Sequence, residues 1–189
     1  MKNLFIKKIT LLLGVVMLCT GCSDYLSELP DGRTLVDSPE KISELITGAY
    51  PNANFMLMAE IMSDNVSDKG VKDQTVDIEE VFYSWGVTTF DTRDTPTQYW
   101  NSCYKAISQA NQALVSIEEL GDGTLSAQRG EALLARAYAH FMLVNFWGKS
   151  YNPATANTDL GIPYVLEPET VLLKDYKRNT VAEVYELIE

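Results

Sequence analysis

The sequence has little of what metal chemistry, nucleophilic catalysis and nucleic-acid binding usually require. It contains one histidine, His140, so a His-rich metal site or a Ser/His/Asp triad would depend on that residue alone. Lysine and arginine total 15 against 26 acidic residues, for a net charge of -11, and this balance excludes the basic surface that binds phosphate backbones. Many acids are present, but their spacing singles out no catalytic pair.

Long hydrophobic runs are also absent. The longest apolar stretch, residues 9–19, follows three lysines and is too short to span a bilayer, which needs about 20 apolar residues. A positive head followed by a short apolar run is typical of a secretory signal peptide. We therefore expect the first residues to be an export signal rather than part of the fold.

The end of this signal predicts a lipid anchor. Thr20-Gly21-Cys22 places a small residue directly before a cysteine, as bacterial lipoprotein signals do, where the cysteine is acylated and begins the mature chain. We expect residues 1–21 to be the signal peptide, Cys22 to carry the acyl chains, and residues 22–37 to form a polar tether. The alternative is an ordinary secretory signal with an incidental cysteine.

Cysteine is scarce as well. If Cys19 leaves with the signal and Cys22 is acylated, Cys103 is the remaining thiol, and an intramolecular disulfide is impossible. Cys103 lies on an apolar helical stripe, which favours a buried, inert thiol over a nucleophile.

Hydrophobic periodicity predicts a mainly α-helical body over residues 38–189. Ser38-Pro39-Glu40 is a helix start, and Thr180 with Glu183 forms a capping box that opens a last helix. Further helical patterns occupy residues 53–62, 98–120 and 126–147, and Pro51 is expected to end or kink the first helix.

Residues 63–96 interrupt the helical pattern because they are rich in Asp, Gly and Thr. Val81-Phe82-Tyr83-Ser84-Trp85 contains β-prone residues, so the sequence predicts an irregular insert with a short strand or a hairpin. After it, the break at Gly121-Asp122-Gly123 predicts an antiparallel helical hairpin. Ala137 and Phe141, four residues apart, are typical of a tetratricopeptide helix pair.

The second helix of this hairpin is apolar around nearly its whole circumference, which predicts burial on several sides. A single helix pair cannot supply that burial, and the sequence reaches Glu189 within a helical pattern. We expect the chain to be the N-terminal portion of a longer helical domain.

The motifs together resemble one family. In order they are Cys22, Gly48-Ala49-Tyr50, Trp100-x-x-x-Tyr104-x-x-Ile107-x-x-x-Asn111, residues 129–141 running on to Phe146-Trp147-Gly148, Gly161-Ile162-Pro163-Tyr164-Val165, and Arg178-x-Thr180-Val181-x-Glu183. This order resembles the SusD/RagB family of Bacteroidetes outer-membrane nutrient-binding lipoproteins. The resemblance implies a tetratricopeptide-like helical scaffold outside the cell. It also implies binding of oligosaccharides, or in some members peptides, and their delivery to a SusC-like TonB-dependent transporter, with no covalent chemistry and no cofactor.

Sugar binding requires aromatic faces that stack on the apolar C–H patches of the sugar ring, and acids or amides that form hydrogen bonds with its hydroxyls. The candidates lie in the irregular insert: Asp64, Asn65, Asp68, Asp73, Tyr83 and Trp85, with Phe82 and Tyr99 as further aromatic rings. The alternatives are a structural role for Trp85 and simple solvation for the acids. Starch-binding members of the family place a ligand-stacking tryptophan before the segment that here contains Trp85. In this sequence the preceding stretch, Asp64–Glu79, has no aromatic residue.

A second group is expected in the core because of its helical spacing: Trp100, Tyr104, Ile107, Asn111, Arg136, Tyr138 and Phe141. Asn111 should be a buried amide with its hydrogen bonds satisfied, and Arg136 should pair with an acid or cap a carbonyl. Three functions remain open: a glycan-binding surface lipoprotein, a glycoside hydrolase driven by two carboxylates, or a helical interaction scaffold without its own ligand.

Overall fold

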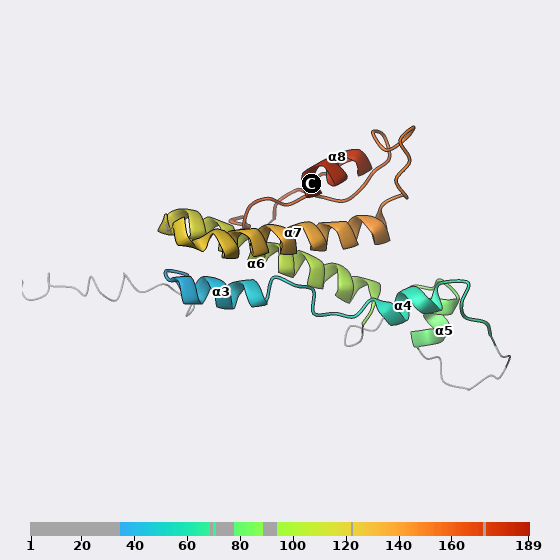
Figure 1. Cartoon of the computed structure of the whole chain (residues 1–189). Coiled ribbons are helices and arrows are strands. Elements are labelled where there is room, and N and C mark those ends of the chain that lie inside the picture. Colours follow the sequence, from blue (N-terminus) through green and yellow to red (C-terminus); the bar gives the residue numbers. More distant parts are fainter. Residues whose placement is uncertain (1–34, 69, 71–77, 89–93, 122, 172) are drawn as a thin grey trace, which may run out of the picture. The chain divides into compact units, whose positions relative to one another are not determined.

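The computed structural model describes residues 35–68, 70, 78–88, 94–121, 123–171 and 173–189. The chain divides after Leu35, and the following description concerns the unit from Val36 to Glu189. Its elements are α3 (Pro39–Thr47), α4 (Met56–Ile61), α5 (Ile78–Tyr83), α6 (Pro96–Leu120), a 3-10 turn (Gly123–Leu125), α7 (Ser126–Trp147) and α8 (Val181–Ile188) (Figure 1). The predicted mainly α class is confirmed. The signal peptide, Cys22 and most of the tether lie outside the described residues.

The predicted helix starts are present as side-chain caps. Ser38 accepts a hydrogen bond from the Lys41 amide, and Thr180 and Glu183 form the reciprocal capping box. Helix α3 ends at Gly48, before the proline that the sequence suggested as its end. Helix α6 ends at Gly121, whose φ of 61° is the left-handed C-cap conformation that glycine adopts without strain.

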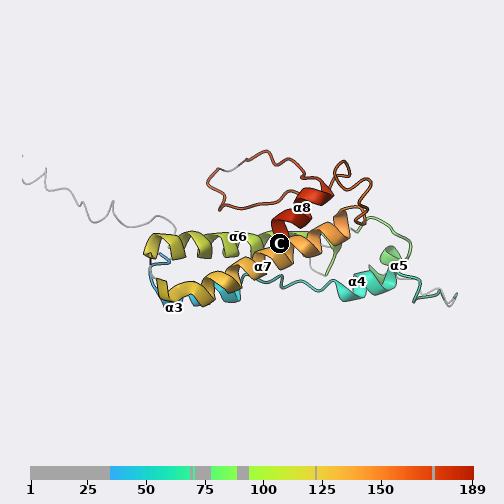
Figure 2. The same ribbon diagram turned by 45° about the horizontal axis from the view of Figure 1, so that its top comes forward.

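Helices α6 and α7 form the predicted hairpin and lie side by side (Figure 2). Their contact is built from small residues that are at most 1% exposed: Ala106, Ala110, Ala113, Ala132, Ala135 and Ala139. Such a stripe lets two helix backbones approach closely. The tetratricopeptide-like contact therefore exists, but it uses Ala135 and Ala139, which lie two positions on either side of Ala137. Ala137 itself is half-buried.

The short strand predicted at residues 81–85 is wrong, because Val81, Phe82 and Tyr83 are the last turn of α5. Ile78 and Phe82, four residues apart, are both buried, at 3% and 2% exposure, in the core cluster that also contains Met58 and Tyr99. Helical spacing brings both side chains to that core, so tertiary packing overrides the β propensity of the segment.

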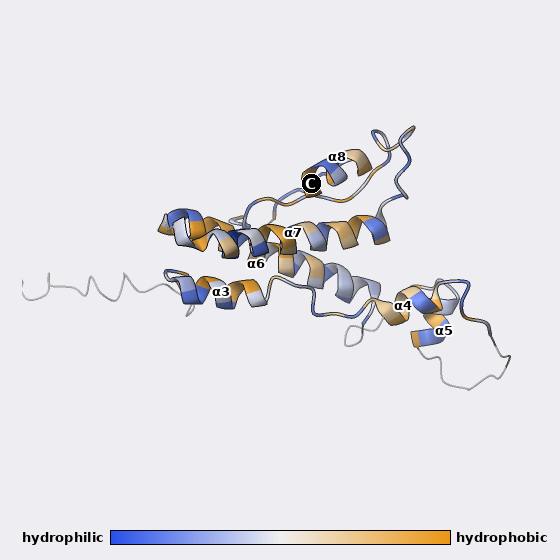
Figure 3. Cartoon of the chain, viewed as in Figure 1, coloured by the Kyte–Doolittle hydropathy of each residue, from blue (hydrophilic) through white to orange (hydrophobic). Residues whose placement is uncertain are grey.

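The expectation that α7 is buried on several sides is only partly met. The helix contacts α3, α6 and α8, and Figure 3 shows both apolar and polar residues along it. However, Leu134 is 65% exposed, Tyr138 41% and Phe141 42%. The placement of Tyr138 and Phe141 in the core is therefore wrong for this unit, because α7 buries its alanine face and leaves their face open.

The segment from Gly161 to Leu166 is extended, and its start pairs with Asn179 through the Gly161 amide and the Ile162 carbonyl, next to an antiparallel bridge between Leu160 and Thr180. Further along, helix side chains satisfy backbone groups of the segment. Tyr104 donates to the Pro163 carbonyl at 2.9 Å and Asn111 donates to the Val165 carbonyl at 3.0 Å. Arg136 donates to the Leu166 carbonyl at 3.4 Å and to the side-chain oxygen of Asn111 at 3.1 Å. The predictions of a satisfied amide at Asn111 and of carbonyl capping by Arg136 are confirmed.

Candidate functional site

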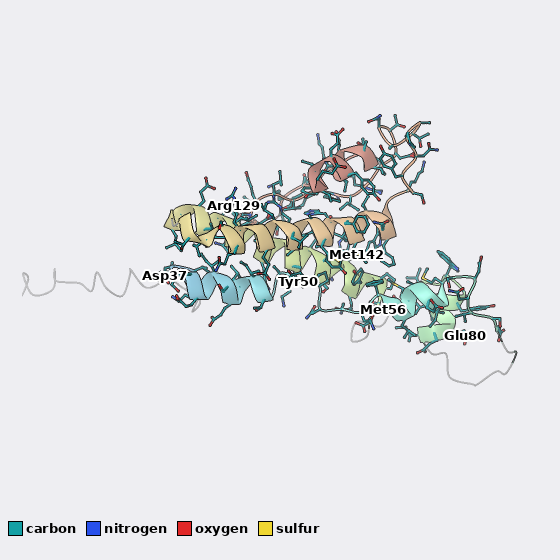
Figure 4. The ribbon with its side chains drawn as sticks, in the orientation of Figure 1. Asp37, Tyr50, Met56, Glu80, Arg129 and Met142 are labelled. Carbon is teal, nitrogen blue, oxygen red and sulfur yellow. The ribbon has the colours of Figure 1, made fainter. Side chains whose placement is uncertain are left out.

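Helices α4 and α5 contact each other and form the candidate site, which we call the α4–α5 module (residues 56–68, 70 and 78–88). Met58, Ile78 and Phe82 bury their side chains in one cluster with Tyr99 of α6. Met56 and Glu80, labelled in Figure 4, mark the two helices. The module is thus fixed to α6 by an apolar core, against which Ile61 and Met62 also pack, and several of its other side chains face solvent.

Trp85 has an unusual backbone conformation at the end of α5. Its φ is 55°, in the left-handed region. The Gly86 amide donates to the Val81 carbonyl at 2.8 Å and the Trp85 amide to the Phe82 carbonyl at 3.0 Å, which is the Schellman pattern of a helix C-terminus. Glycine normally occupies the left-handed position of that motif, since any side chain there costs on the order of 1 kcal/mol.

Packing of the Trp85 indole does little to offset the cost of this backbone conformation, because the residue is 71% exposed. Backbone strain combined with a solvent-exposed aromatic ring is the pattern expected at a binding site rather than in a core. Other exposed apolar residues of the module are Met56 at 67%, Leu57 at 47%, Tyr83 at 42% and Val87 at 92%. Exposed apolar residues gathered in one small module indicate a contact surface.

The structure brings together some of the predicted ligand residues. The Asp68 amide donates to the hydroxyl of Tyr83 at 3.3 Å, and the Asp68 carboxylate accepts from the Gly70 amide at 2.7 Å. Asp64 and Asn65 are exposed in the turn that follows α4, and no contact among the described residues joins them to Tyr83. Asp73 lies outside the described residues.

Two of the further aromatic rings are not available to a ligand. Phe82 is 2% exposed and Tyr99 is 1% exposed. The Tyr99 ring lies 5.3 Å from that of Phe55 and 5.6 Å from that of Phe146, so it is a core residue. Both rings lie in the helix faces that pack on each other, which only the tertiary structure could show.

Reactive side chains outside the module are buried and neutral. Burial raises the pKa of the Cys103 thiol to about 11, which leaves it protonated near neutral pH, as predicted for an inert thiol. Burial lowers the pKa of His140 to about 4. Within the residues that the structure describes, no three His, Cys, Asp or Glu side chains gather as a metal site, and no helix has the length and apolar character to cross a membrane.

Sequence reasoning missed a second feature, a cavity beside α6. Trp100 and Tyr104, which were expected in the core, are half-buried and pack against the core cluster, and they also line this cavity with Ile107. The opposite wall includes Glu167, Glu169 and Tyr176 from an irregular segment. The signal available in the sequence was the presence of Glu167, Glu169 and Tyr176 within ten positions of this irregular segment.

The structure thus combines a helical hairpin with a module that exposes aromatic side chains. A family model described as "Starch-binding associating with outer membrane" matches residues 24–189. The chain therefore belongs to the SusD/RagB family, whose members bind glycans at the outer membrane. No curated protein gives a significant match to the sequence.

Proposed function

We propose that this protein is a cell-surface lipoprotein that binds oligosaccharides through the α4–α5 module and passes them to a SusC-like TonB-dependent transporter. The observation that carries the proposal is Trp85, which holds an exposed indole at a backbone position where glycine would be more stable. An aromatic face of this kind stacks on the apolar C–H patches of a sugar ring.

Polar groups of the same module supply the complementary chemistry. The carboxylates of Asp64 and Asp68 and the amide of Asn65 are exposed beside the end of α4, and sugar hydroxyls need such acceptors and donors. Tyr83 is within hydrogen-bonding distance of the Asp68 amide, so it links the ends of the two helices. We propose Asp73 as a further ligand residue on the basis of the sequence alone.

The location follows from the proposed anchor. Acyl chains on Cys22 would hold the protein at the outer membrane, and residues 22–37 would act as the tether that leaves the module facing outward. Family membership supports the outer membrane as the site of action. The signal sequence supports the lipid, and the acidic net charge supports a neutral glycan rather than a nucleic acid.

We propose binding without turnover. The only histidine is inaccessible at 0% exposure, and Cys103 is likewise 0% exposed. Incubation with soluble glycans, followed by calorimetry and chromatography of the sugar, tests this directly. The expected result is binding of at least one oligosaccharide with no change in its length, whereas release of shorter products would support the glycoside hydrolase instead.

A matched pair of variants locates the site. Trp85→Ala should weaken oligosaccharide binding by about tenfold, the effect of removing a central aromatic contact. Tyr151→Ala removes an exposed aromatic ring outside the module and should leave the affinity unchanged. Equal affinities for the two variants would contradict a role for the module.

A helical scaffold that binds a protein is the second candidate. Leu134, Tyr138 and Phe141 occupy an open face of α7, where exposed apolar side chains favour a contact with another helix. This face is compatible with transporter docking, and it would be sufficient by itself if no glycan bound.

A further inference from the structure

A cavity of about 290 Å³ lies between α6 and the irregular segment that precedes Arg178. Its lining residues are Trp100, Tyr104, Ile107, Ser108, Pro163, Val165, Glu167, Glu169 and Tyr176. The helix side is rigid, because Tyr104 and Asn111 fasten α6 to the extended segment through the Pro163 and Val165 carbonyls. None of these lining residues belongs to the α4–α5 module.

The charged side chains of the lining are all negative. Three of the lining residues are aromatic, with ring faces that carry partial negative charge, and Glu167 and Glu169 contribute carboxylates. No lysine, arginine or histidine is among the lining residues. The Lys174 ammonium lies 5.4 Å from the centroid of the Tyr176 ring, but Lys174 does not line the cavity.

The hydroxyl donors of the two tyrosines are already used. Tyr104 donates to the Pro163 carbonyl at 2.9 Å, and Tyr176 donates to the Glu169 carboxylate at 2.5 Å. The Glu167 carboxylate has no hydrogen-bond or ion-pair partner among the described residues. The cavity thus offers two carboxylates and three aromatic rings, and the donors that remain in its lining are the Ser108 hydroxyl and the Trp100 indole N–H.

We propose that this cavity is a binding site for an organic ammonium cation with apolar substituents, separate from the glycan site. Aromatic faces attract a cation within about 6 Å of the ring centroid, and a nearby carboxylate adds charge attraction. Methyl or methylene groups on the cation would fill the apolar wall formed by Ile107, Pro163 and Val165.

Choline is a suitable probe because 3,3-dimethylbutan-1-ol has the same shape without the charge. Each is titrated into the purified full chain and followed by saturation-transfer NMR of its methyl protons, with maltose as a third ligand. We expect choline to bind about tenfold more tightly than the neutral alcohol, and to do so with or without oligosaccharide at the other site. Equal binding of choline and the alcohol, or binding of maltose alone in this cavity, would overturn the proposal.

Variants identify the cavity as the source of that signal. Glu167→Gln removes one charge from an exposed, unpaired side chain, so it should weaken choline binding about three- to tenfold without changing the melting temperature. Glu186→Gln makes the same change on α8, outside the lining, and should have no effect. An unchanged choline affinity in Glu167→Gln, or an equal loss in both variants, would overturn the assignment. Because Trp85→Ala leaves this cavity intact, failure of glycan binding and failure of cation binding are distinguishable.

Discussion

His140 shows how the environment of one residue decides its role. Its Nε2 accepts a hydrogen bond from the Val165 amide at 3.0 Å, so Nδ1 must carry the proton that is donated to the Arg136 carbonyl at 2.9 Å. The ring also stacks on Tyr164 with a centroid distance of 3.7 Å. These contacts require the neutral imidazole, and they make His140 a structural link between α7 and the extended segment.

This arrangement predicts a pH-dependent stability. Burial lowers the pKa of His140 from 6.5 to about 4. Between pH 4 and pH 6.5, the unfolded chain therefore binds a proton on this side chain that the folded chain does not bind. Its contribution to the free energy of unfolding is complete above pH 6.5 and is lost as the pH falls toward 4, with a total of about 3 kcal/mol. Urea unfolding at pH 7.5 and pH 4.5 measures the change.

The control for this prediction is His140→Gln, which has no titrating group and can offer both a donor and an acceptor. Carboxylates elsewhere titrate equally in both proteins, so the difference between their pH profiles isolates the histidine. Parallel profiles would show that His140 is not responsible.

Trp85 predicts an opposition between stability and binding. Trp85→Gly places the favoured residue at a φ of 55° and should stabilise the fold by about 1 kcal/mol, or roughly 2–4 °C in melting temperature. The same change should weaken oligosaccharide binding as strongly as Trp85→Ala does. Thermal unfolding and calorimetry on the three proteins provide the comparison.

Trp85→Ala is the matched control, because it removes the indole and keeps a side chain in the left-handed conformation. It should lose binding without gaining stability. A glycine variant that is less stable than the alanine variant would show that the indole itself supports the fold.

At the scale of elements, the extended segment explains a pattern that periodicity alone could not. The helical spacing of Tyr104, Asn111 and Arg136 predicted that they belong to the core, and these residues do lie on inward helix faces. Their hydroxyl, amide and guanidinium groups, however, satisfy backbone groups of Pro163, Val165 and Leu166. A segment distant in sequence determines this role, because the carbonyls of Pro163, Val165 and Leu166 must find hydrogen-bond donors.

The α6–α7 contact predicts opposite effects for two substitutions on α7. Ala135 is 0% exposed and packs with Ala49 and Ala110, so Ala135→Leu should destabilise the fold by about 1–3 kcal/mol through overpacking. Gly130 lies within α7, and an added Cβ would meet no atom within 4 Å, so Gly130→Ala should stabilise it by about 1 kcal/mol. Denaturant midpoints of the two variants should move in opposite directions; a shift in the same direction would contradict the assigned faces.

For the whole molecule, the anchor can be tested without knowing the ligand. Cys22→Ala removes the proposed acylation site, so the protein should move from the membrane fraction to the soluble fraction, because each buried CH₂ of a lipid contributes about 0.8 kcal/mol to membrane attachment. Fractionation followed by immunoblotting gives the distribution. Cys103→Ala is the control, since its thiol is buried and its loss should leave the protein with the membrane.

The local signals in the sequence were sufficient for α3, α4, α6, α7 and α8, for the caps at Ser38, Thr180 and Gly121, and for the family. Ser38, Thr180 and Gly121 act through neighbouring backbone groups, and the apolar spacing of α6 and α7 is a property of a single helix, so short windows of sequence contain the information. The tertiary structure alone decided the rest. Phe82 forms part of a helix because a core formed by distant residues accepts its side chain, and Trp100 lines a cavity because a segment more than sixty residues later forms the other wall. Contacts between segments far apart in the chain determine those outcomes, and no local pattern records them.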